Sequence, residues 1–251
     1  MGEKAMVAEP VERQSEQALL SVDGVSSGYG SARILQNVSF SVERHEILAI
    51  VGRNGVGKTT LMKTLIGLLR LMDGRIEFKG ESIGRFRPSR RADRGIAYVP
   101  QGRGIFNRMS VTENLLLGQG LGGQGRKANY DRVYRFFPRL KERGSQKAGS
   151  MSGGEQQQLA IGRVLVGHPE LILLDEPSEG IQPNIVQEIG QIIRRLTEQE
   201  DLTVIIVEQN LELIHSVADR CMVMDKGTII AHVTPDEIAD PEVAKRYLAI
   251  A

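Results

Sequence analysis

The segment GRNGVGKT (52–59) restricts the fold of this chain more than any other feature of its sequence. It follows EILAIVG (46–52), a nearly continuous apolar run that is typical of a strand covered on both faces. It precedes KTTLMKTLIGLL (58–69), in which the apolar residues have helical spacing. A glycine-rich turn between a buried strand and a helix is the context in which this motif binds phosphate, so the sequence predicts an α/β nucleotide-binding protein.

The chemistry of the predicted phosphate loop follows from its residue types. Glycines allow successive backbone N–H groups to converge on phosphate oxygens, and the helix N-terminus adds a partial positive charge. We expect Lys58 to reach the β- and γ-phosphates and Thr59 to place its hydroxyl on Mg²⁺. A chance match in a glycine-rich chain is the alternative, which the strand before the motif and the helix after it disfavour. The predicted nucleotide contacts in this loop are Gly52, Asn54, Gly55, Gly57, Lys58, Thr59 and Thr60.

Strand-like and helical segments alternate along most of the chain, which predicts a mainly parallel sheet. Segments 75–80 and 95–101 have the apolar pattern of strands. From Gln101 to about Gly167 helical patterns dominate, which predicts a helical subdomain, and Pro138 should bend or end one of its helices. After this region the α/β alternation returns and continues to a predicted hairpin and a final helical segment.

The composition limits the possible partners and the compartment of the chain. The formal net charge is +1, which gives no reason to expect a nucleic acid or an anionic membrane as a direct partner. Cys221 is the only cysteine in the sequence, so an intrachain disulfide is excluded. No apolar run approaches about 18 residues, and segment 1–17 lacks the apolar stretch of a signal peptide. We therefore expect a cytoplasmic protein with a flexible tail at 1–17, which reaches a membrane only through partners.

Two adjacent carboxylates follow another apolar run. In LILLDEP (171–177) four apolar residues lead directly to Asp175 and Glu176. Ligands bind at the carboxyl ends of the strands in open α/β sheets, so both acids are expected beside the phosphate loop. We expect Asp175 to hold the Mg²⁺ shell and Glu176 to polarise an attacking water. An inert acidic turn is the alternative, which the phosphate loop elsewhere in the chain disfavours.

A second glycine-rich turn occurs in MSGGEQQQLA (151–160). Ser152 as N-cap and Glu155 three residues later form a capping box, which is the simplest interpretation. That interpretation leaves Gly153 and Gly154 unexplained, and each weakens a helix start by about 0.5–1 kcal/mol relative to alanine. This cost suggests that another group approaches the bare backbone, and a phosphate suits free N–H groups at a helix N-terminus.

The four motifs together resemble the nucleotide-binding domain of ATP-binding-cassette (ABC) transporters. GRNGVGKT, VPQ (99–101), MSGGEQQQLA and LILLDEP occur in the order of that family and at roughly its spacing. The resemblance spans about 18–251 and implies a single ATPase domain that binds ATP and Mg²⁺. The implied fold is α/β, with a P-loop RecA-like core at about 18–100 and 168–251, a mainly parallel sheet, an antiparallel β region and a helical subdomain at about 101–167.

The resemblance also offers a role for the second glycine turn. Two domains of this family pair head to tail, so Ser152, Gly153 and Gly154 of one are expected to close over the γ-phosphate bound by the other. Tyr29 matches the aromatic residue that stacks on adenine. Gln101 matches the glutamine that contacts Mg²⁺ and the attacking water.

One position departs from the family pattern. After the strand TVIIVE many members place a histidine that senses the γ-phosphate, whereas this chain has Gln209. An amide can donate to a phosphate oxygen but cannot become cationic, so a weaker sensing role is expected. His215 should lie on the following helix and is not expected to substitute. The predicted catalytic residues are Glu176, Gln209 and Gln101, and the predicted metal contacts are Thr59, Gln101 and Asp175.

Three segments resemble the second ATPase of bacterial importers for branched-chain amino acids and for urea or short amides. They are VEQN (207–210), VPQGRGIF (99–106) and DEPSEGIQP (175–183), and the segment that begins at Ser178 is slightly closer to the urea branch. The implied partners are a second ABC ATPase subunit of the same or a different sequence, two permease subunits and, indirectly, a solute-binding protein. The ATPase would lie on the inner face of the cell membrane through the permeases.

The segment 103–117 is where a permease helix is expected to dock, and subdomain core is the alternative for its apolar residues. Two other functions stay open for the whole chain. A non-transport ABC ATPase is disfavoured because the chain has a single cassette and no heptads. A nucleotide-binding regulatory module without turnover is disfavoured because Glu176 is present.

Overall fold

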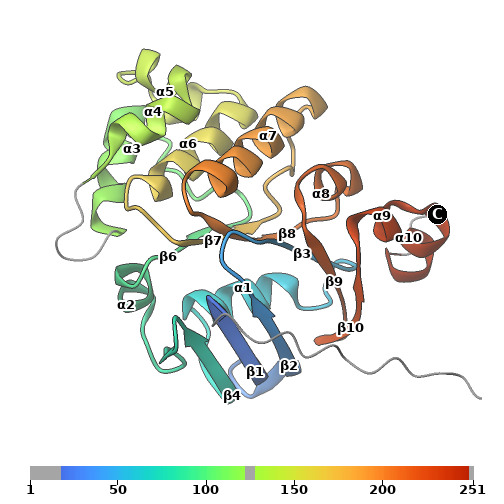
Figure 1. Cartoon of the computed structure of the whole chain (residues 1–251). Coiled ribbons are helices and arrows are strands. Elements are labelled where there is room, and N and C mark those ends of the chain that lie inside the picture. Colours follow the sequence, from blue (N-terminus) through green and yellow to red (C-terminus); the bar gives the residue numbers. More distant parts are fainter. Residues whose placement is uncertain (1–17, 122–127, 249–251) are drawn as a thin grey trace, which may run out of the picture.

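The computed structural model describes residues 18–121 and 128–248, which form stacked layers (Figure 1). The tail predicted at 1–17 lies outside the described residues. In Figure 1 an antiparallel sheet lies at the bottom, one helix lies above it, a mainly parallel sheet crosses the middle, and a group of helices forms the top layer. The predicted α/β fold class is confirmed.

Six strands of the described chain form the central sheet, in the order β10 (Thr228–Val233), β9 (Arg220–Asp225), β3 (Ile47–Val51), β8 (Thr203–Val207), β7 (Leu171–Asp175) and β6 (Ile96–Val99). Neighbouring strands run parallel except β10, which pairs antiparallel with β9 as the predicted hairpin. Every residue of β3, β7 and β8 is buried. Continuous apolar strands of this kind need cover on both faces, and the layers above and below provide it.

The second sheet is antiparallel, with the order β2 (Ala32–Val42), β1 (Leu20–Tyr29), β4 (Leu71–Phe78) and β5 (Glu81–Ser82) among the described residues. β4 begins at Leu71 rather than at Arg75, where the sequence pattern placed it. Gly74 makes this extension possible, because it has φ +87° and a Cβ there would lie 2.4 Å from the carbonyl oxygen of Gly24. Without a side chain at this crossing, β1 and β4 stay paired as far as Leu71.

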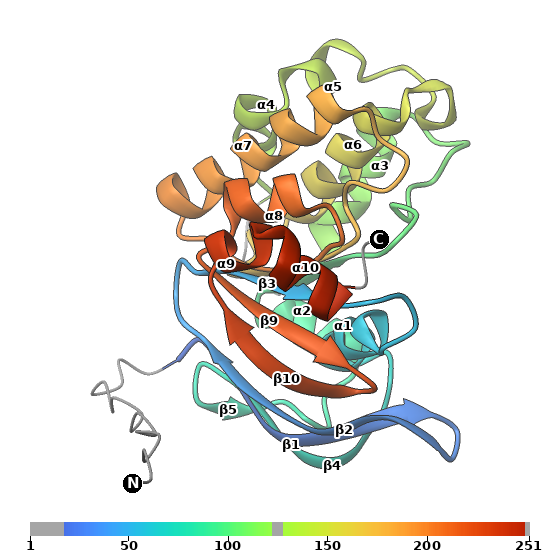
Figure 2. The same ribbon diagram turned by 90° about the vertical axis from the view of Figure 1, so that its right-hand side faces the viewer.

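Helix α1 (Lys58–Ile66) lies between the two sheets (Figures 1 and 2). It ends earlier than the helical pattern 58–69 predicted. Gly67 adopts φ +85°, a left-handed conformation that ends helices, and its N–H donates to the carbonyl of Thr64 at 3.1 Å. Leu61 and Leu65 of α1 pack in the apolar cluster that the two sheets share.

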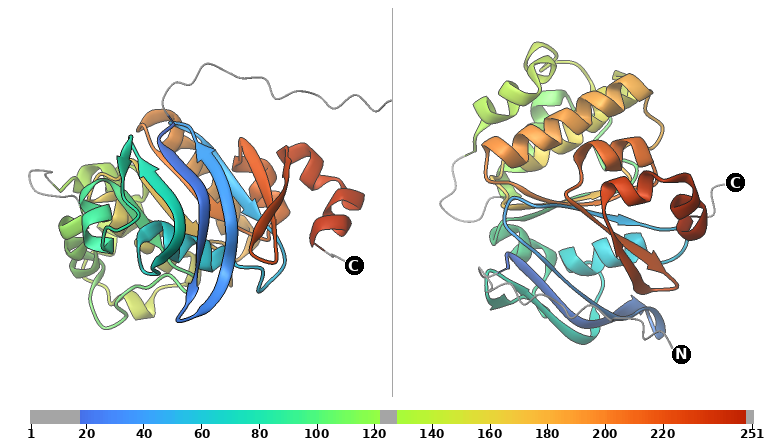
Figure 3. Two further views of the ribbon diagram at one scale, coloured as in Figure 1. Left: turned by 90° about the horizontal axis from the view of Figure 1, so that it is seen from below. Right: turned by 45° about the vertical axis from the view of Figure 1, so that its right-hand side comes forward.

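The remaining described helices are α2 (Pro88–Asp93), α3 (Val111–Leu117), α4 (Tyr130–Phe136), α5 (Pro138–Glu142), α6 (Gly153–Leu165), α7 (Pro183–Gln199), α8 (Leu211–Val217), α9 (Pro235–Ala239) and α10 (Pro241–Leu248), with short 3₁₀ turns at Gly118–Leu121 and Ala148–Ser150. Pro138 separates α4 from α5, as predicted. Ser110, Ser152 and Thr234 each begin a helix with a capping box. Figure 3 shows α9 and α10 beside the β9–β10 hairpin.

Two apolar clusters form the core, one on each face of the central sheet. Leu48 and Ile50 of β3 belong to the cluster with α1 and the antiparallel sheet, whereas Ile47, Ala49 and Val51 belong to the cluster with the helices. Side chains alternate along a strand, which explains this division. The helical cluster is continuous from the sheet into α3, α4 and α6. The predicted boundaries of the helical subdomain stay predictions.

Arg91 on α2 is a buried cation that holds the C-terminal end of α1. The side chain is 1% exposed, and its Nη1 donates to the carbonyls of Thr64 at 2.7 Å and Leu65 at 2.6 Å. Its Nη2 donates to the carbonyl of Gly84 at 3.1 Å. Burial lowers the pKa of Arg91 to about 10. The carbonyls at a helix C-terminus carry partial negative charge, which favours a cation there.

We expect Arg91→Met to lower the free energy of unfolding by about 2 kcal/mol, because two buried carbonyls and one half-buried carbonyl lose a charged donor. Chemical denaturation followed by circular dichroism measures this change. Arg85→Met removes an exposed arginine of the same region, and its free energy of unfolding should stay within about 0.5 kcal/mol of the wild-type value. Equal stability of the two variants would show that Arg91 does not hold α1.

Candidate functional site

The topology brings four loops to one edge of the central sheet, because β3, β8, β7 and β6 are parallel neighbours. β3 leads into the phosphate loop and β7 ends at Asp175. β6 leads to Gln101 and β8 leads to Gln209. The structure therefore places the predicted catalytic residues at the carboxyl ends of the strands, where ligands bind in α/β folds.

The phosphate loop leaves the N-terminus of α1 open. The helix starts after Gly57, which has φ +113° and supplies no side-chain cap, whereas α3 and α6 have capping side chains. A helix end of this kind binds anions through its unpaired N–H groups. Gly52 is needed for packing beneath the loop, since a Cβ there would lie 2.3 Å from the carbonyl oxygen of Met224. Gly55 has φ +82° and faces open space.

Lys58 folds back over the phosphate loop. Its Nζ donates to the carbonyl of Gly52 at 2.6 Å and to that of Arg53 at 2.9 Å. Burial lowers the pKa of Lys58, and the neighbouring carboxylates of Glu176 and Asp175 oppose that shift. A partly desolvated ammonium held at a helix N-terminus favours an anionic ligand.

A hollow of about 360 Å³ opens beside the phosphate loop, a size within the range of small-molecule sites. Tyr29, at the end of β1, is 48% exposed, and the Nζ of Lys63 lies 5.9 Å from its ring centroid. Ile34 on β2 also lines the hollow and was not predicted, because only the antiparallel pairing of β2 with β1 brings it here. The predicted residues that line the hollow are Tyr29, Asn54, Gly55, Gly57, Lys58, Thr59, Thr60, Gln101 and Glu176.

Thr59 and Asp175 are neighbours at the floor of the site. The Thr59 hydroxyl donates to Oδ1 of Asp175 at 3.1 Å, and the hydroxyl of Tyr98 donates to Oδ2 at 3.0 Å. Burial raises the pKa of Asp175, although the two hydrogen bonds lower it. Tyr98 was not predicted as a site residue, because its place in β6 gave no sign of the neighbouring strand β7.

The oxygen atoms of Thr59 and Asp175 suit Mg²⁺. This ion is usually held by one or two carboxylates, with water and substrate phosphates as the other ligands. Within residues 18–121 and 128–248, no group of three or more His, Cys, Asp or Glu side chains forms a metal site. The donor set therefore fits Mg²⁺ together with a phosphate and does not fit a transition metal held by the protein alone.

Glu176 is held in place by two amides. It has φ +50°, a left-handed backbone conformation that costs about 1–3 kcal/mol for a residue with a side chain. Gln101 Nε2 donates to its Oε2 at 3.0 Å, and Gln209 Nε2 donates to its Oε1 at 2.9 Å. Gln209 Nε2 also donates to Oδ1 of Asn54 in the phosphate loop at 2.7 Å. His215 lies on α8 and pairs with Asp236 at 2.9 Å, so it does not replace Gln209.

Glu208 organises the loops around Glu176 and was missed by sequence analysis. Its side chain is 2% exposed. Oε1 accepts from the N–H of Ser178 at 2.8 Å, and Oε2 accepts from the N–H groups of Gln209 at 2.8 Å and Asn210 at 3.0 Å. A charged residue directly after an apolar strand was the only signal in the sequence, and it did not reveal the partner loop that follows β7.

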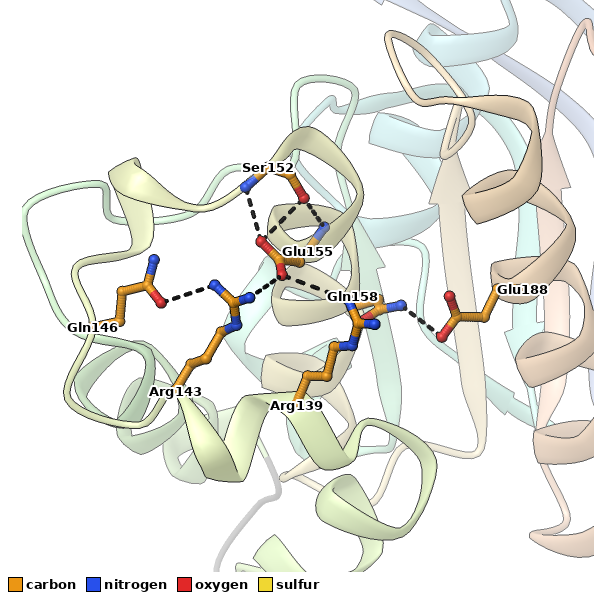
Figure 4. A network of polar contacts seen from close by, with 7 residues as sticks. All are labelled: Arg139, Arg143, Gln146, Ser152, Glu155, Gln158 and Glu188. Carbon is orange, nitrogen blue, oxygen red and sulfur yellow. Dashed lines mark hydrogen bonds and ion pairs between the residues drawn. The ribbon is translucent and has the colours of Figure 1, made fainter.

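The second glycine turn begins α6 with the predicted capping box (Figure 4). The N–H of Ser152 donates to Oε2 of Glu155 at 3.0 Å, and its hydroxyl donates to the same oxygen at 3.1 Å. Arg143 lies 3.1 Å and Arg139 3.9 Å from Oε1 of Glu155. Burial raises the pKa of Glu155, but the Ser152 hydrogen bonds and the two arginines outweigh it and leave this pKa below its ordinary value.

Packing within the chain bears on both glycines of this turn. A Cβ at Gly154 would lie 2.4 Å from Cγ2 of Ile185 on α7, so only glycine fits there. A Cβ at Gly153 would lie 3.0 Å from Nη2 of Arg103 and 3.2 Å from the carbonyl oxygen of Gly180. Packing against Ile185 therefore requires glycine at position 154, whether or not a phosphate also approaches this turn. The contact of Ser152, Gly153 and Gly154 with a nucleotide stays a prediction, since the lining of the hollow does not include them.

Residues 35–179 match the family described as "ABC transporter". This match covers more than half of the chain and includes the phosphate loop, Gln101, the second glycine turn and both carboxylates. The chain belongs to the ABC transporter family. It is an ATP-binding subunit. Among the helices that the structure describes, none is both long enough and apolar enough to cross a membrane.

Two curated proteins illustrate the range of relatives. The chain is 44% identical over 235 residues to the high-affinity branched-chain amino acid transport ATP-binding protein BraG of Pseudomonas aeruginosa, which covers 92% of this chain and 99% of BraG. It is 34% identical over 233 residues to the lipopolysaccharide export system ATP-binding protein LptB of Haemophilus influenzae, which covers 91% of this chain and 96% of LptB.

Solved structures of ATP-binding cassettes share the fold. A nucleotide-free cassette from an ABC transporter superposes with a TM-score of 0.79 at 27% identity, covering 91% of this chain and 98% of that chain. A cassette in its ADP conformation superposes with a TM-score of 0.79 at 28% identity, with the same coverage.

We expect Asp175→Asn to make the ligand-free protein more stable than the ligand-free wild type. We also expect that Mg²⁺–ATP, which stabilises the wild type, no longer stabilises the variant. Because burial raises the pKa of Asp175, the folded state holds this proton more tightly than the unfolded chain, so the contribution of Asp175 to stability falls as pH rises above about 4. At pH 7.5 the variant should melt about 3 °C higher than the wild type, and this gain should vanish below about pH 4.

Thermal unfolding with and without Mg²⁺–ATP measures both effects. Asp23→Asn replaces an exposed aspartate on β1 and should change neither the melting temperature of the ligand-free protein nor its increase with Mg²⁺–ATP. A lower melting temperature of Asp175→Asn at pH 7.5 would contradict the inferred cost of the buried carboxylate.

Proposed function

We propose that the chain hydrolyses ATP to drive a bacterial importer. The observation that carries hydrolysis is the Glu176 carboxylate, which Gln101 and Gln209 hold beside the phosphate loop. In this proposal Lys58 binds the terminal phosphates, while Thr59, Asp175 and Gln101 hold Mg²⁺. The ion bound there neutralises charge on the phosphate oxygens.

Glu176 acts in this proposal on the attacking water. A carboxylate beside the γ-phosphate accepts a hydrogen bond from that water and polarises it. The amides of Gln101 and Gln209 orient the carboxylate, because each donates to a different oxygen of Glu176. Gln209 also contacts Asn54, which supports its role as a sensor of the nucleotide in the loop. Tyr29, half exposed at the rim of the hollow, supplies a ring for adenine.

The catalytic unit proposed here contains two ATPase subunits in head-to-tail arrangement. Ser152 is exposed at the start of α6 and lies outside the lining of the nucleotide hollow of its own chain. A second subunit, of the same or a different sequence, supplies the phosphates that Ser152, Gly153 and Gly154 are proposed to contact. ATP then joins the two subunits, and its hydrolysis releases them.

Exposed apolar residues after Gln101 support a permease docking surface. Phe106, Leu116 and Leu117 are 45–49% exposed, whereas Val111 and Leu115 in the same segment are fully buried. Val111 and Leu115 therefore belong to the core of the helical subdomain. The proposed contact with a permease helix is made by the three exposed side chains. Two permease subunits attached here would hold the ATPase at the inner face of the membrane, with a solute-binding protein as an indirect partner.

For the cargo we propose branched-chain amino acids, with urea or short amides as the second candidate. The 44% identity to BraG over nearly the full length of both chains supports the first. Lipopolysaccharide export, the role of the relative LptB, has less support at 34% identity. A non-transport ATPase or a binding module without turnover would show no response of hydrolysis to membrane subunits.

We expect Glu176→Gln to lower ATP hydrolysis by at least about 100-fold while ATP binding persists, because general-base catalysis is lost and the phosphate loop is intact. Gln209→Ala should lower the rate by about fivefold, the value of one neutral hydrogen bond. Phosphate release assays and nucleotide binding measure these effects, and the exposed Gln187→Ala serves as control. Unchanged hydrolysis in Gln209→Ala together with loss in Glu176→Gln would exclude the sensing role of Gln209.

We expect membrane vesicles with this ATPase, its companion ATPase and its permeases to accumulate labelled leucine when ATP and the solute-binding protein are supplied. The Glu176→Gln subunit in the same vesicles is the matched control and should abolish uptake. Accumulation of urea in place of leucine would select the second candidate cargo. Hydrolysis without accumulation of either solute would contradict an importer of these substrates.

A further inference from the structure

The loop after Gln101 has an unusual backbone. Gly102, Arg103 and Gly104 have φ values of +77°, +71° and +62°, so three successive residues are left-handed. The N–H of Gly104 donates to the carbonyl of Gly102 at 2.8 Å, which closes a γ-turn with positive φ at Arg103. This is the rarer and more strained of the two γ-turn forms. A glycine would adopt this conformation with less strain, so the surrounding structure holds Arg103 in it.

The side chain of Arg103 connects two other loops of the site. Its Nη1 donates to Oε1 of Gln156 on α6 at 3.1 Å. Its Nη2 donates to the carbonyl of Glu179, in the loop that follows Glu176, at 3.4 Å. The same Nη2 occupies the space beside Gly153 that a Cβ would need. Arg103 therefore contacts both the start of α6 and the loop after β7.

Gln156 extends this connection to the turn that contains Ser152. Its Nε2 donates to the carbonyls of Ala148 and Met151, each at 3.2 Å. Met151 directly precedes Ser152, so these bonds position the backbone that enters the turn. Figure 4 shows the complementary bonds of Ser152 to Glu155, which hold the turn from within α6.

The three segments joined by Arg103 all have proposed roles toward nucleotide. Gln101, two residues before Arg103, contacts Glu176, and Glu179 follows Glu176 by three residues. Ser152 is proposed to meet the nucleotide of the second subunit. A displacement of Gln101 by bound phosphate would reach α6 through the strained turn and the guanidinium of Arg103, because these contacts join the segments.

We propose that Arg103 is a positioning residue that couples Gln101 in the nucleotide site of one subunit to the Ser152 turn that the same subunit presents to its partner. This inference rests on the proposed function, because it requires the head-to-tail pair. Arg103 contacts no reacting group in this proposal. It sets the relative positions of the Ser152 turn and the loop around Glu179, so that nucleotide in one site prepares the subunit for association.

ATP-driven association of the Glu176→Gln protein tests this proposal. Sedimentation velocity of the parent, alone and mixed with its companion ATPase, gives the dissociation constant of the pair with Mg²⁺–ATP. Arg103→Met should weaken association at least about tenfold, because the charged hydrogen bonds to Gln156 and to the carbonyl of Glu179 are both lost. Binding of fluorescent ATP to the separated subunit should stay within about twofold, because the variant leaves the phosphate loop intact.

Further variants separate coupling from a general loss of structure. Gln156→Leu should weaken association as Arg103→Met does, and the double variant should be no weaker than either single one, because both break one path. Arg103→Lys should restore association only in part, since an ammonium lacks the planar fork that reaches two acceptors. Arg108→Met removes an exposed arginine of the same loop, and its pair should have the same dissociation constant as that of the parent.

The outcomes distinguish this inference from the function on which it rests. If the parent associates and Arg103→Met associates equally well, the role of Arg103 is excluded and the pairing stands. Additive effects of Arg103→Met and Gln156→Leu, or a parallel loss of ATP binding, would also exclude it. If the parent fails to associate both alone and with its companion, the proposed pairing is excluded and the role of Arg103 with it.

Discussion

The parallel pairing of β3, β8 and β7 is the constraint on which the site depends. These strands are buried on both faces, so the two apolar clusters fix their order and register from above and below. Asp175 is paired with Val207 at the end of β7, which sets it beside Thr59 at the start of α1. Because side chains alternate along a strand, a slip of one residue would turn Asp175 away from Thr59 and separate the proposed metal contacts.

The site that this packing creates contains several groups in unfavourable states. Burial raises the pKa of Asp175 and lowers that of Lys58, so each is desolvated in its charged form. Glu176 and Arg103 both have left-handed backbone conformations. Glu208 is a buried carboxylate that three backbone N–H groups satisfy. Such states persist only where the surrounding structure holds them. The proposed ligand, a phosphate with Mg²⁺, would compensate the charges of Lys58 and Asp175.

Sequence analysis located most of the hollow because its motifs are local. A phosphate loop lies within a few consecutive residues, and Glu176 was assigned from a similarly local run. Tyr29 and Gln101 were assigned from the resemblance to the ABC family. Tyr98 and Glu208 were missed because their roles depend on contacts with distant loops. The residues next to a tyrosine within a strand, or next to a carboxylate that follows a strand, do not indicate which distant group that side chain contacts. The packing of Gly154 against Ile185 was missed for the same reason, since the two residues are remote in sequence.

The sequence by itself determined the fold class and the identity of the phosphate loop, because these follow from short-range periodicity and from residue types at fixed spacing. The family was indicated by the resemblance of four motifs, in their order, to the nucleotide-binding domain of ABC transporters. The sequence also determined the start of α6, where the capping partners Ser152 and Glu155 are three residues apart. Tertiary structure alone decided which buried groups hold the loops and how Arg103 joins them. Those contacts link segments far apart in the chain, and only the packing of helices on the sheet brings their atoms within hydrogen-bond distance.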